Sequence, residues 1–306
     1  MNLAIGCHVS AAGGVWNAPK NAADLGCETF QIFTRPPMGG KAPEFNDSII
    51  KRFKDEMKAH QLGDFVVHCP YFVNFGSAQP RIYHGSVSVV RGELERASLL
   101  GAKYVMTHLG SFKDMGQEKG MKQAKAGLKE VLKGYKGSSE FLLEIAAGSG
   151  EIIGDTFEEL AELMEPLVKL KGFGGICFDT QHAFSSGYDL RDRESVALTF
   201  SKFNKAIGLQ WLKMSHINDS KIDLGGKKDR HEHIGDGKIG KKGFEAILGY
   251  FNTLSATSPS VPPLTGGGKS NIVESMPLIL ETEHDKVKED IKMLKTLRTP
   301  KLVKQK

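Results

Sequence analysis

Short runs of β-branched and aromatic residues alternate with longer amphipathic segments along the whole chain. The first kind is typical of buried strands and the second of helices with one apolar face. The short runs predict strands at residues 3–8, 29–34, 65–68, 104–108, 141–145, 175–179, 211–217 and 277–282. The longer segments predict helices at residues 46–61, 87–100, 117–135, 157–167, 195–207, 242–251 and 287–297. This alternation is the content of a (β/α)8 barrel, although a doubly wound open sheet would show the same pattern.

The polar residues that end the predicted strands favour the closed barrel. From Thr34 to His216 they follow one another at intervals of 34 to 40 residues, which is one strand-helix unit each. Groups with that spacing point into the C-terminal mouth of a barrel, where the active sites of this fold lie. An open sheet would spread the same groups along a line, too far apart to share ions. We therefore predict an α/β fold with a single (β/α)8 TIM barrel over residues 1–300.

The regular spacing is broken between His216 and Glu281, which lie 65 residues apart. One part of this interval is a polar loop that carries Asp229 and His231. The other part, residues 255–275, is rich in Ser, Pro, Thr and Gly, a composition typical of a flexible surface insertion. The last residues, 301–306, predict a solvated basic tail.

Composition narrows the function classes only slightly. Lysine and arginine together number 41 and aspartate and glutamate 36, a net charge of +5 that would help binding to a polyanion. The four cysteines are widely spaced and indicate buried thiols in a reducing compartment, not a disulfide framework or a CxxC zinc site. The chain shows no signal peptide and no apolar run near the ~18 residues of a membrane span. We expect an intracellular monomer, cytoplasmic or nucleoid-associated.

A set of potential metal ligands falls at the predicted barrel mouth. Its members are His68, His108, Glu144, Asp179, His182, His216, Asp229, His231 and Glu281. A structural role is the simpler interpretation of any one histidine, but burying four carboxylates without partners would be very costly. Imidazole and carboxylate together suit zinc, and nine groups exceed the three of a single catalytic zinc. The set therefore predicts two or three ions, an arrangement that suits phosphoryl displacement.

Several short motifs follow one another along residues 3–297. They are GCHVSAAGG at 6–14, HLGS at 108–111, CFDTQHA at 177–183, HIND at 216–219, DRH at 229–231 and LET at 280–282. In kind and order these motifs resemble those of endonuclease IV, the family of zinc-dependent apurinic/apyrimidinic endonucleases. Such a set is far more specific than one short motif.

The resemblance implies three zinc ions per chain. The first would be held by His68, His108 and Glu144, the second by Glu144, Asp179, His216 and Glu281, and the third by His182, Asp229 and His231. Glu144 would bridge the first two ions and would also be the catalytic carboxylate. The implied activity is hydrolysis of the phosphodiester 5′ to an abasic site in double-stranded DNA. It would leave a 3′ hydroxyl, and the same site would trim blocked 3′ ends.

The resemblance also implies residues that contact DNA. They are Arg35, Met38 and Lys41 after the second strand, Tyr71 and Phe72 after the third, and Arg230 beside two ligands. The family's loop after the second strand presents an asparagine, an arginine and an aromatic residue, whereas this chain reads RPPMGGK at 35–41. Met38 could wedge a base step, as apolar residues do elsewhere. For Phe72, packing at the barrel mouth is the competing interpretation.

Some neighbouring positions also differ from the family or allow two roles. Ile145 and Ala146 replace a usual asparagine-threonine pair, which predicts altered tuning of the ions and not their loss. Asn218 and Asp219 would orient ligands or cap a turn. For His8 we predict a structural role or a contact that supports the metal ligands, and for His233 a loop contact or a contact to a DNA phosphate.

Two other functions are compatible with the same residues. A sugar isomerase or epimerase on a metal-binding barrel also draws histidines and carboxylates from strand ends. It needs only one or two ions, so His182, Asp229 and His231 would be surplus. A non-catalytic binder of abasic DNA would retain damaged duplexes without cutting them.

Overall fold

The computed structural model describes residues 2–257 and 275–299 of the chain. Its strands are β1 (Asn2–His8), β2 (Thr29–Ile32), β3 (Phe65–His68), β4 (Tyr104–Thr107), β5 (Glu140–Glu144), β6 (Phe173–Cys177), β7 (Leu212–His216), β8 (Asp219–Ser220), β9 (His231–Glu232) and β10 (Ser275–Leu280). Its α-helices are α1 (Ala18–Leu25), α2 (Asp47–Ala59), α3 (Pro80–Leu100), α4 (Gln117–Leu132), α5 (Phe157–Met164), α6 (Thr180–Ser185), α7 (Arg193–Ala206), α8 (Gly240–Thr257) and α9 (Val287–Arg298).

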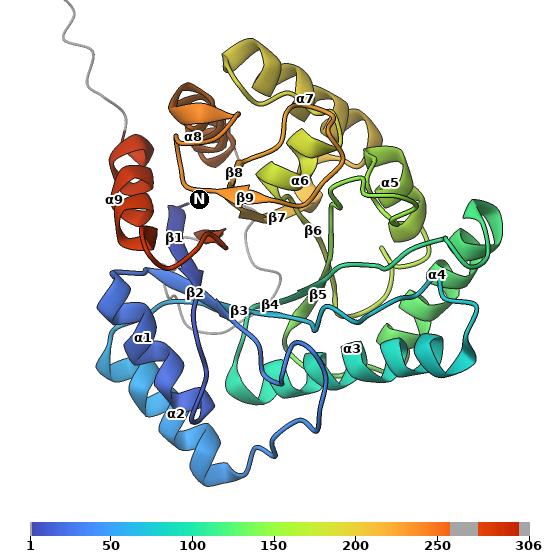
Figure 1. Ribbon diagram of the computed structural model, residues 1–306. Helices are drawn as coiled ribbons and strands as arrows, with labels where there is room; N and C mark the ends of the chain where they lie inside the picture. Colours follow the sequence, from blue (N-terminus) through green and yellow to red (C-terminus); the bar gives the residue numbers. More distant parts are fainter. Residues whose placement is uncertain (1, 258–274, 300–306) are drawn as a thin grey trace, which may run out of the picture.

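Strands β1 to β7 and β10 form a closed parallel barrel, which confirms the predicted fold. The barrel closes between β1 and β10, whose register runs from Asn2 opposite Ser275 to Cys7 opposite Leu280. Figure 1 shows the helices surrounding these strands. Each strand is covered on both faces, so most of the residues along the strands are buried.

Two apolar cores explain why the polar strand ends meet. The larger core lies between the strands and the helices, and the smaller one fills the barrel with residues such as Val66, Leu142 and Met214. Side chains two positions apart on a strand share a face. His68, Glu144 and His216 each follow a residue of the inner core by two positions, so they lie directly above it, at the C-terminal mouth.

Several boundaries differ from the sequence prediction. Helix α3 begins at Pro80, seven residues before the predicted start, because proline is well accommodated in the first helical turn. Helix α1 was not predicted; it is short and alanine-rich, and it is followed by the C-cap residue Gly26, whose φ of 79° suits glycine. Strand β6 ends at Cys177, so Asp179 belongs to the start of α6 and not to the strand.

The predicted insertion at 255–275 lies almost wholly outside the described residues, and so does the basic tail at 301–306. Helix α8 continues to Thr257, and β10 already begins at Ser275. Among residues 2–257 and 275–299, no helix combines the length and the apolar character needed to cross a membrane.

Candidate metal centre

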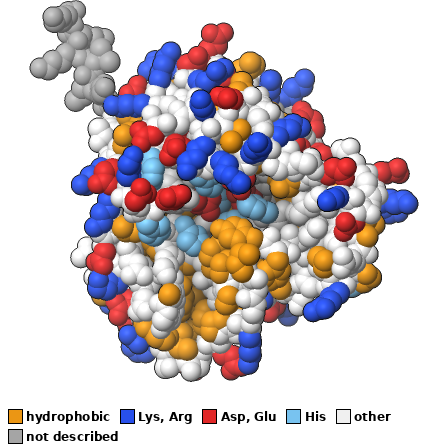
Figure 2. Space-filling view, viewed as in Figure 1, with side chains coloured by type: hydrophobic (Ala, Val, Ile, Leu, Met, Phe, Trp, Pro, Cys, Tyr) orange, Lys and Arg blue, Asp and Glu red, His pale blue; other side chains and the backbone are white. Residues whose placement is uncertain are grey.

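The structure brings the nine predicted ligands together at the mouth. They come from the ends of β3, β5 and β7, from the residues after β4 and β10, from the start of α6, and from the loop that contains β9. Among these nine residues, three groups have ligand atoms within 4.8 Å of one another: His68, His108 and Glu144; Glu144, Asp179, His216 and Glu281; and Asp179, His182 and His231. The third group contains Asp179 in place of the predicted Asp229. Figure 2 shows histidine side chains gathered in a hollow on this face.

Glu144 lies at the centre of the cluster, with its two oxygens directed toward different histidines. Its Oε2 is 3.2 Å from Nε2 of His68 and 3.5 Å from Nε2 of His108. Its Oε1 is 2.8 Å from Nδ1 of His216 and 3.4 Å from Nδ1 of His182. This carboxylate is therefore placed to join two groups of ligands.

Asp179 and His182 owe their positions to the start of α6. Asp179 is the N-cap residue, and its Oδ1 accepts a 2.8 Å hydrogen bond from the His182 backbone N–H, as aspartate commonly does there. Its other oxygen, Oδ2, faces the cluster, 3.7 Å from Nδ1 of His216 and 3.8 Å from Nε2 of His231. Asp229 lies across from this helix start, with Oδ2 3.4 Å from Nε2 of His182 and Oδ1 3.3 Å from Nε2 of His231.

The tautomers of two histidines are set by backbone carbonyls. Nδ1 of His68 donates to the carbonyl of Cys69 at 2.6 Å, and Nδ1 of His182 donates to that of Ile145 at 2.9 Å. Each ring therefore presents the lone pair of Nε2 to the cluster, as metal-binding histidines commonly do. Because His182 contacts the backbone of Ile145, replacing the side chain at that position leaves this contact in place.

The chemistry of the donor set fits divalent cations. The Nε2 atoms of His182 and His231 are buried and have no hydrogen-bond partner. A buried polar atom without a partner is costly, and a bound cation would remove that cost. A mixed set of imidazole nitrogens and carboxylate oxygens suits zinc better than calcium or magnesium, which prefer oxygen ligands.

The electrostatics of the cluster show strong coupling between acids and bases. Burial raises the pKa of Glu144, but His216 and His108 more than offset this and hold its pKa well below the usual range. Burial and the histidines act on Glu281 in the same opposed way and leave its pKa at about 2. Burial lowers the pKa of His216, but Cys177, Glu281 and Glu144 together raise it above its usual value. The carboxylates are therefore ionised at neutral pH and attract positive charge.

Asn218 and Asp219, adjacent in sequence, have different roles. The Asn218 Nδ2 atom donates to Oδ2 of Asp179 at 2.9 Å, and its Oδ1 accepts from the backbone N–H of Glu281 at 2.7 Å. Asn218 thus orients two of the proposed ligands. The Asp219 carboxylate instead accepts backbone N–H groups of Gly235, Gly237 and other residues, and so stabilises the turn before α8.

Two buried residues near the cluster were not predicted. Cys177 has its Sγ in a group with Glu144 and His216, and burial raises the pKa of its thiol to about 11. Gln31 contacts both His216 and Glu281. A cysteine and a glutamine inside apolar strands carry no signal of their own, because only the neighbouring strands reveal what they contact.

His8 and His233, which are not among the nine candidate ligands, contact other side chains of the protein. His8 interacts with Gln31 through Nδ1 at 3.1 Å, and burial lowers its pKa to about 4. His233 lies between Asp290 and Asp285, at 2.7 and 3.1 Å. His8 therefore contacts a residue that itself binds Glu281, and His233 joins its loop to Asp285 and to Asp290 of α9.

Most of the predicted DNA contacts are exposed to solvent. Met38, with 84% of its surface exposed, projects from the loop after β2, and Lys41 is also exposed. Tyr71 is 53% and Phe72 42% exposed. Tyr71 and Arg230 line a cavity of about 360 Å³ together with six of the nine candidate ligands. In Figure 2, lysines and arginines border one edge of the hollow and hydrophobic side chains border another.

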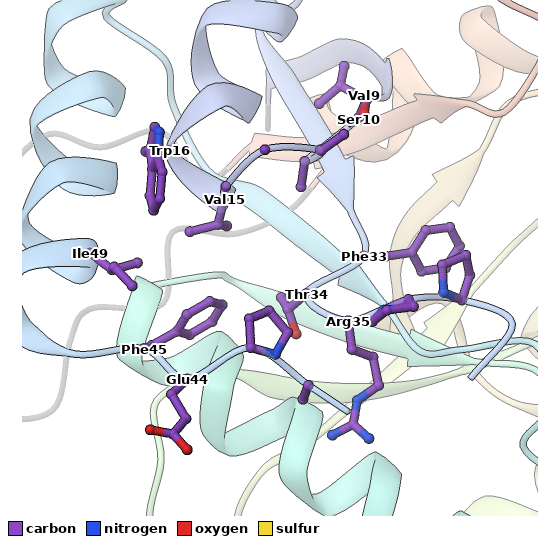
Figure 3. Close-up of a pocket in the computed structure, with 18 of the residues that line it drawn as sticks. Val9, Ser10, Val15, Trp16, Phe33, Thr34, Arg35, Glu44, Phe45 and Ile49 are labelled. Atoms are coloured by element: carbon purple, nitrogen blue, oxygen red, sulfur yellow. Dashed lines mark hydrogen bonds between the residues drawn. The ribbon is translucent and has the colours of Figure 1, made fainter. Parts of the chain in front are cut away.

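Arg35 differs from the other predicted contacts because its side chain is directed inward. Its Nε donates to Oε1 of the buried Glu93 at 2.6 Å, and only 14% of its side chain is exposed. Figure 3 shows Arg35 extending toward α3, beneath an open cleft. Arg96 of α3 binds the same loop, donating to the carbonyls of Thr34 and Pro43. Helix α3 therefore fixes the base of the loop whose tip carries Met38.

The cleft in Figure 3 has a volume of about 1000 Å³ and lies between the loops after β1 and β2. Its walls include Trp16, Phe45 and Ile49, so it is largely apolar. Phe33 borders both the cleft and the metal centre, with its ring centroid 5.6 Å from that of His68.

Comparisons with known proteins agree with this geometry. Residues 19–297 match a family model described as a xylose isomerase-like TIM barrel. The chain is 42% identical over 246 residues to the probable endonuclease 4 of Methanoculleus marisnigri, covering 80% of this chain and 86% of that protein. It is 37% identical over 295 residues to the probable endonuclease 4 of Nitrosopumilus maritimus, covering 96% and 98%. The crystal structure of endonuclease IV from Thermus thermophilus aligns with a TM-score of 0.76 and 27% identity, covering 96% of this chain and 98% of that one.

Proposed function

Because the chain belongs to the endonuclease IV family, we propose that it cuts double-stranded DNA at abasic sites. It would hydrolyse the phosphodiester 5′ to the lesion and leave a 3′ hydroxyl, and it would also trim blocked 3′ ends. The observation that carries the proposal is the convergence of the nine proposed ligand side chains in one barrel mouth. Eight of them form groups that share Glu144 and Asp179, and Asp229 lies beside His182 and His231. An enzyme that uses a single catalytic zinc ion needs only three protein ligands.

The cofactor in this proposal is zinc, three ions per chain. His68, His108 and Glu144 would hold the first ion, Glu144, Asp179, His216 and Glu281 the second, and His182, Asp229 and His231 the third. The two unpartnered imidazole nitrogens support the third assignment, since Asp229 lies within 3.4 Å of both. Bound zinc would supply Lewis-acid stabilisation of phosphoryl oxygens and a water of lowered pKa.

The chain's own residues would bind and orient the substrate. Arg230 and Lys221 line the cavity beside the cluster and would attract a backbone phosphate. Tyr71 and Met38 are exposed on neighbouring loops and would enter the duplex, as apolar and aromatic side chains do in other DNA-bending proteins. An abasic nucleotide has no base to unpair, so moving it out of the duplex into the cavity costs least at the lesion. The residues thus favour damaged over intact DNA.

The test is incubation of purified, zinc-loaded protein with an end-labelled duplex that contains one abasic site, without added magnesium. We expect a single nick 5′ to the site and a terminus that a polymerase can extend. The same duplex without the lesion is the control and should stay intact. Failure of metal-replete protein to cut the abasic duplex would overturn the proposal, and retention without cutting would indicate a non-catalytic binder.

A sugar isomerase or epimerase is the second candidate, because the matched family model is described as xylose isomerase-like. That function has no use for the additional ligands His182, Asp229 and His231. Metal analysis separates the two: about three zinc ions per chain support the nuclease, whereas one manganese or magnesium ion supports the isomerase.

A further inference from the structure

Gln31 is a fully buried amide in β2, a strand whose four residues are all buried. Its Nε2 donates to Oε1 of Glu281 at 2.6 Å and lies 3.1 Å from Nδ1 of His8. Its Oε1 lies 2.8 Å from Nε2 of His216. A buried amide requires hydrogen-bond partners, and this one finds two of them among the proposed metal ligands.

The chemistry of the partners determines which way the amide faces. An ionised carboxylate can only accept hydrogen bonds, so the Nε2 of Gln31 must face Glu281. Its carbonyl oxygen then faces His216 and can only accept. The Nε2 of His216 must therefore carry a proton. In the structure Nδ1 donates to the ionised Glu144, whereas with a metal ion bound the neutral ring would keep its proton on Nε2 and offer the lone pair of Nδ1.

The Nδ1 atom of His216 faces the second group of ligands. It lies 2.8 Å from Oε1 of Glu144 and 3.3 Å from Oε2 of Glu281. With a metal ion bound, His216 would thus have the opposite tautomer to His68 and His182, which donate from Nδ1 to backbone carbonyls. The acceptor for the His216 ring is instead the side chain of Gln31. Gln31 also restrains one oxygen of Glu281 and leaves the other directed toward the same group.

We propose that Gln31 is a positioning residue for the metal centre. It sets the tautomer of His216 and the rotation of Glu281, and through both it strengthens the hold on the second ion. This inference rests on the metal centre of the proposed function. Residues that hold metal ligands in this way typically contribute about 10–100-fold to metal affinity.

Two substitutions separate the two contacts. Gln31→Met keeps the length of the side chain but removes both the donor and the acceptor. Gln31→Glu still accepts from His216 but cannot donate to Glu281. Gln123→Met is the matched control, because Gln123 also makes two hydrogen bonds, to the backbone carbonyls of Phe75 and Ser77, but lies on α4, away from the ligand groups.

The measurements are zinc affinity, by competition with a chromogenic chelator, and long-range proton–nitrogen spectra of zinc-loaded protein labelled with ¹⁵N-histidine. We expect one ion to bind about 10–100-fold more weakly in Gln31→Met. The spectra should show His216 with its proton on Nε2 in the wild type and in Gln31→Glu, and should change in Gln31→Met. Gln123→Met should match the wild type in both measurements.

Wild-type zinc affinity together with an unchanged His216 spectrum in Gln31→Met would overturn the inference. If Gln31→Met does not fold, the zinc affinity of Gln31→Glu decides the question, because this variant has lost the donor to Glu281. Weaker zinc binding by Gln31→Glu supports the inference, and wild-type zinc affinity overturns it. A wild-type protein that binds no zinc would instead refute the proposed metal centre itself, so the two failures can be told apart.

Discussion

Glu144→Gln is the substitution that tests the proposed cluster most directly. The side chain is buried, and its two oxygens face His68 and His108 on one side and His216 and His182 on the other. Glutamine has nearly the same shape but only one acceptor oxygen. Its NH₂ group would therefore replace an acceptor on one of the two sides, and that side would lose its shared ligand.

The expected loss can be estimated from this geometry. At least one of the first two ions should dissociate, so zinc content should fall by about one or more per chain. Metal ions contribute several kcal/mol of charge stabilisation in the transition state. A loss of about 4 kcal/mol corresponds to about a 10³-fold lower rate, since each ~1.4 kcal/mol is a factor of ten.

The assay combines elemental analysis of dialysed protein with single-turnover cutting of an abasic duplex. Glu283→Gln is the matched control, because Glu283 lines the same cavity but is exposed and outside the metal-capable groups. It should retain its zinc and cut within a few-fold of the wild-type rate. If Glu144→Gln retained full zinc content and wild-type cutting, the central position of Glu144 would have to be abandoned.

Three further substitutions test other parts of the site and the fold. Asp229→Asn should release about one zinc ion and leave the other two; unchanged zinc content would contradict its assignment. Arg96→Ala should free the loop that carries Met38 and lower affinity for abasic DNA about 10-fold, measured by fluorescence anisotropy, with zinc content unchanged as the check on the cluster. Glu28→Gln should cost about 1–2 kcal/mol in urea unfolding at pH 7, because it breaks the ion pair with Arg298. Burial raises the pKa of Glu28, but Arg298 and a backbone N–H lower it below 4.5, so the difference should shrink as the pH falls below 4.5.

The sequence predicted the barrel and the ligand set for the same physical reason. Inner-face residues of parallel strands recur at intervals of one strand-helix unit, so polar residues such as His68, Glu144 and His216 could be placed at one mouth without coordinates. The exact ends of strands were less predictable, and Asp179 belongs to a helix start because its carboxylate caps α6. Asp179 nevertheless lies at the mouth, as predicted, because α6 begins three residues after the C-terminal end of β6.

Contacts between distant segments could not be read from the sequence. Arg35 lies in a polar loop, where an arginine usually faces solvent, yet α3 supplies a buried carboxylate 58 residues later. Gln31 is separated by 250 residues from Glu281. Strands β8 and β9 are two residues each, too short for any periodic pattern to show. In each case the decisive partner comes from another element, and only the closed barrel brings it near.

The loop between β7 and α8 shows how one segment can extend an ordinary barrel site. Its strands β8 and β9 pair Asp219 with Glu232 and Ser220 with His231, which returns the chain to the mouth. Gln181 of α6 donates to the carbonyl of Lys228 and so holds the residue before Asp229. These contacts fix the loop at His231 and next to Asp229, the two proposed ligands that face His182. Because strand ends and the residues next to them supply the ligands of the first two groups, the third group depends on this loop, and the proposed difference between a nuclease and an isomerase depends on it too.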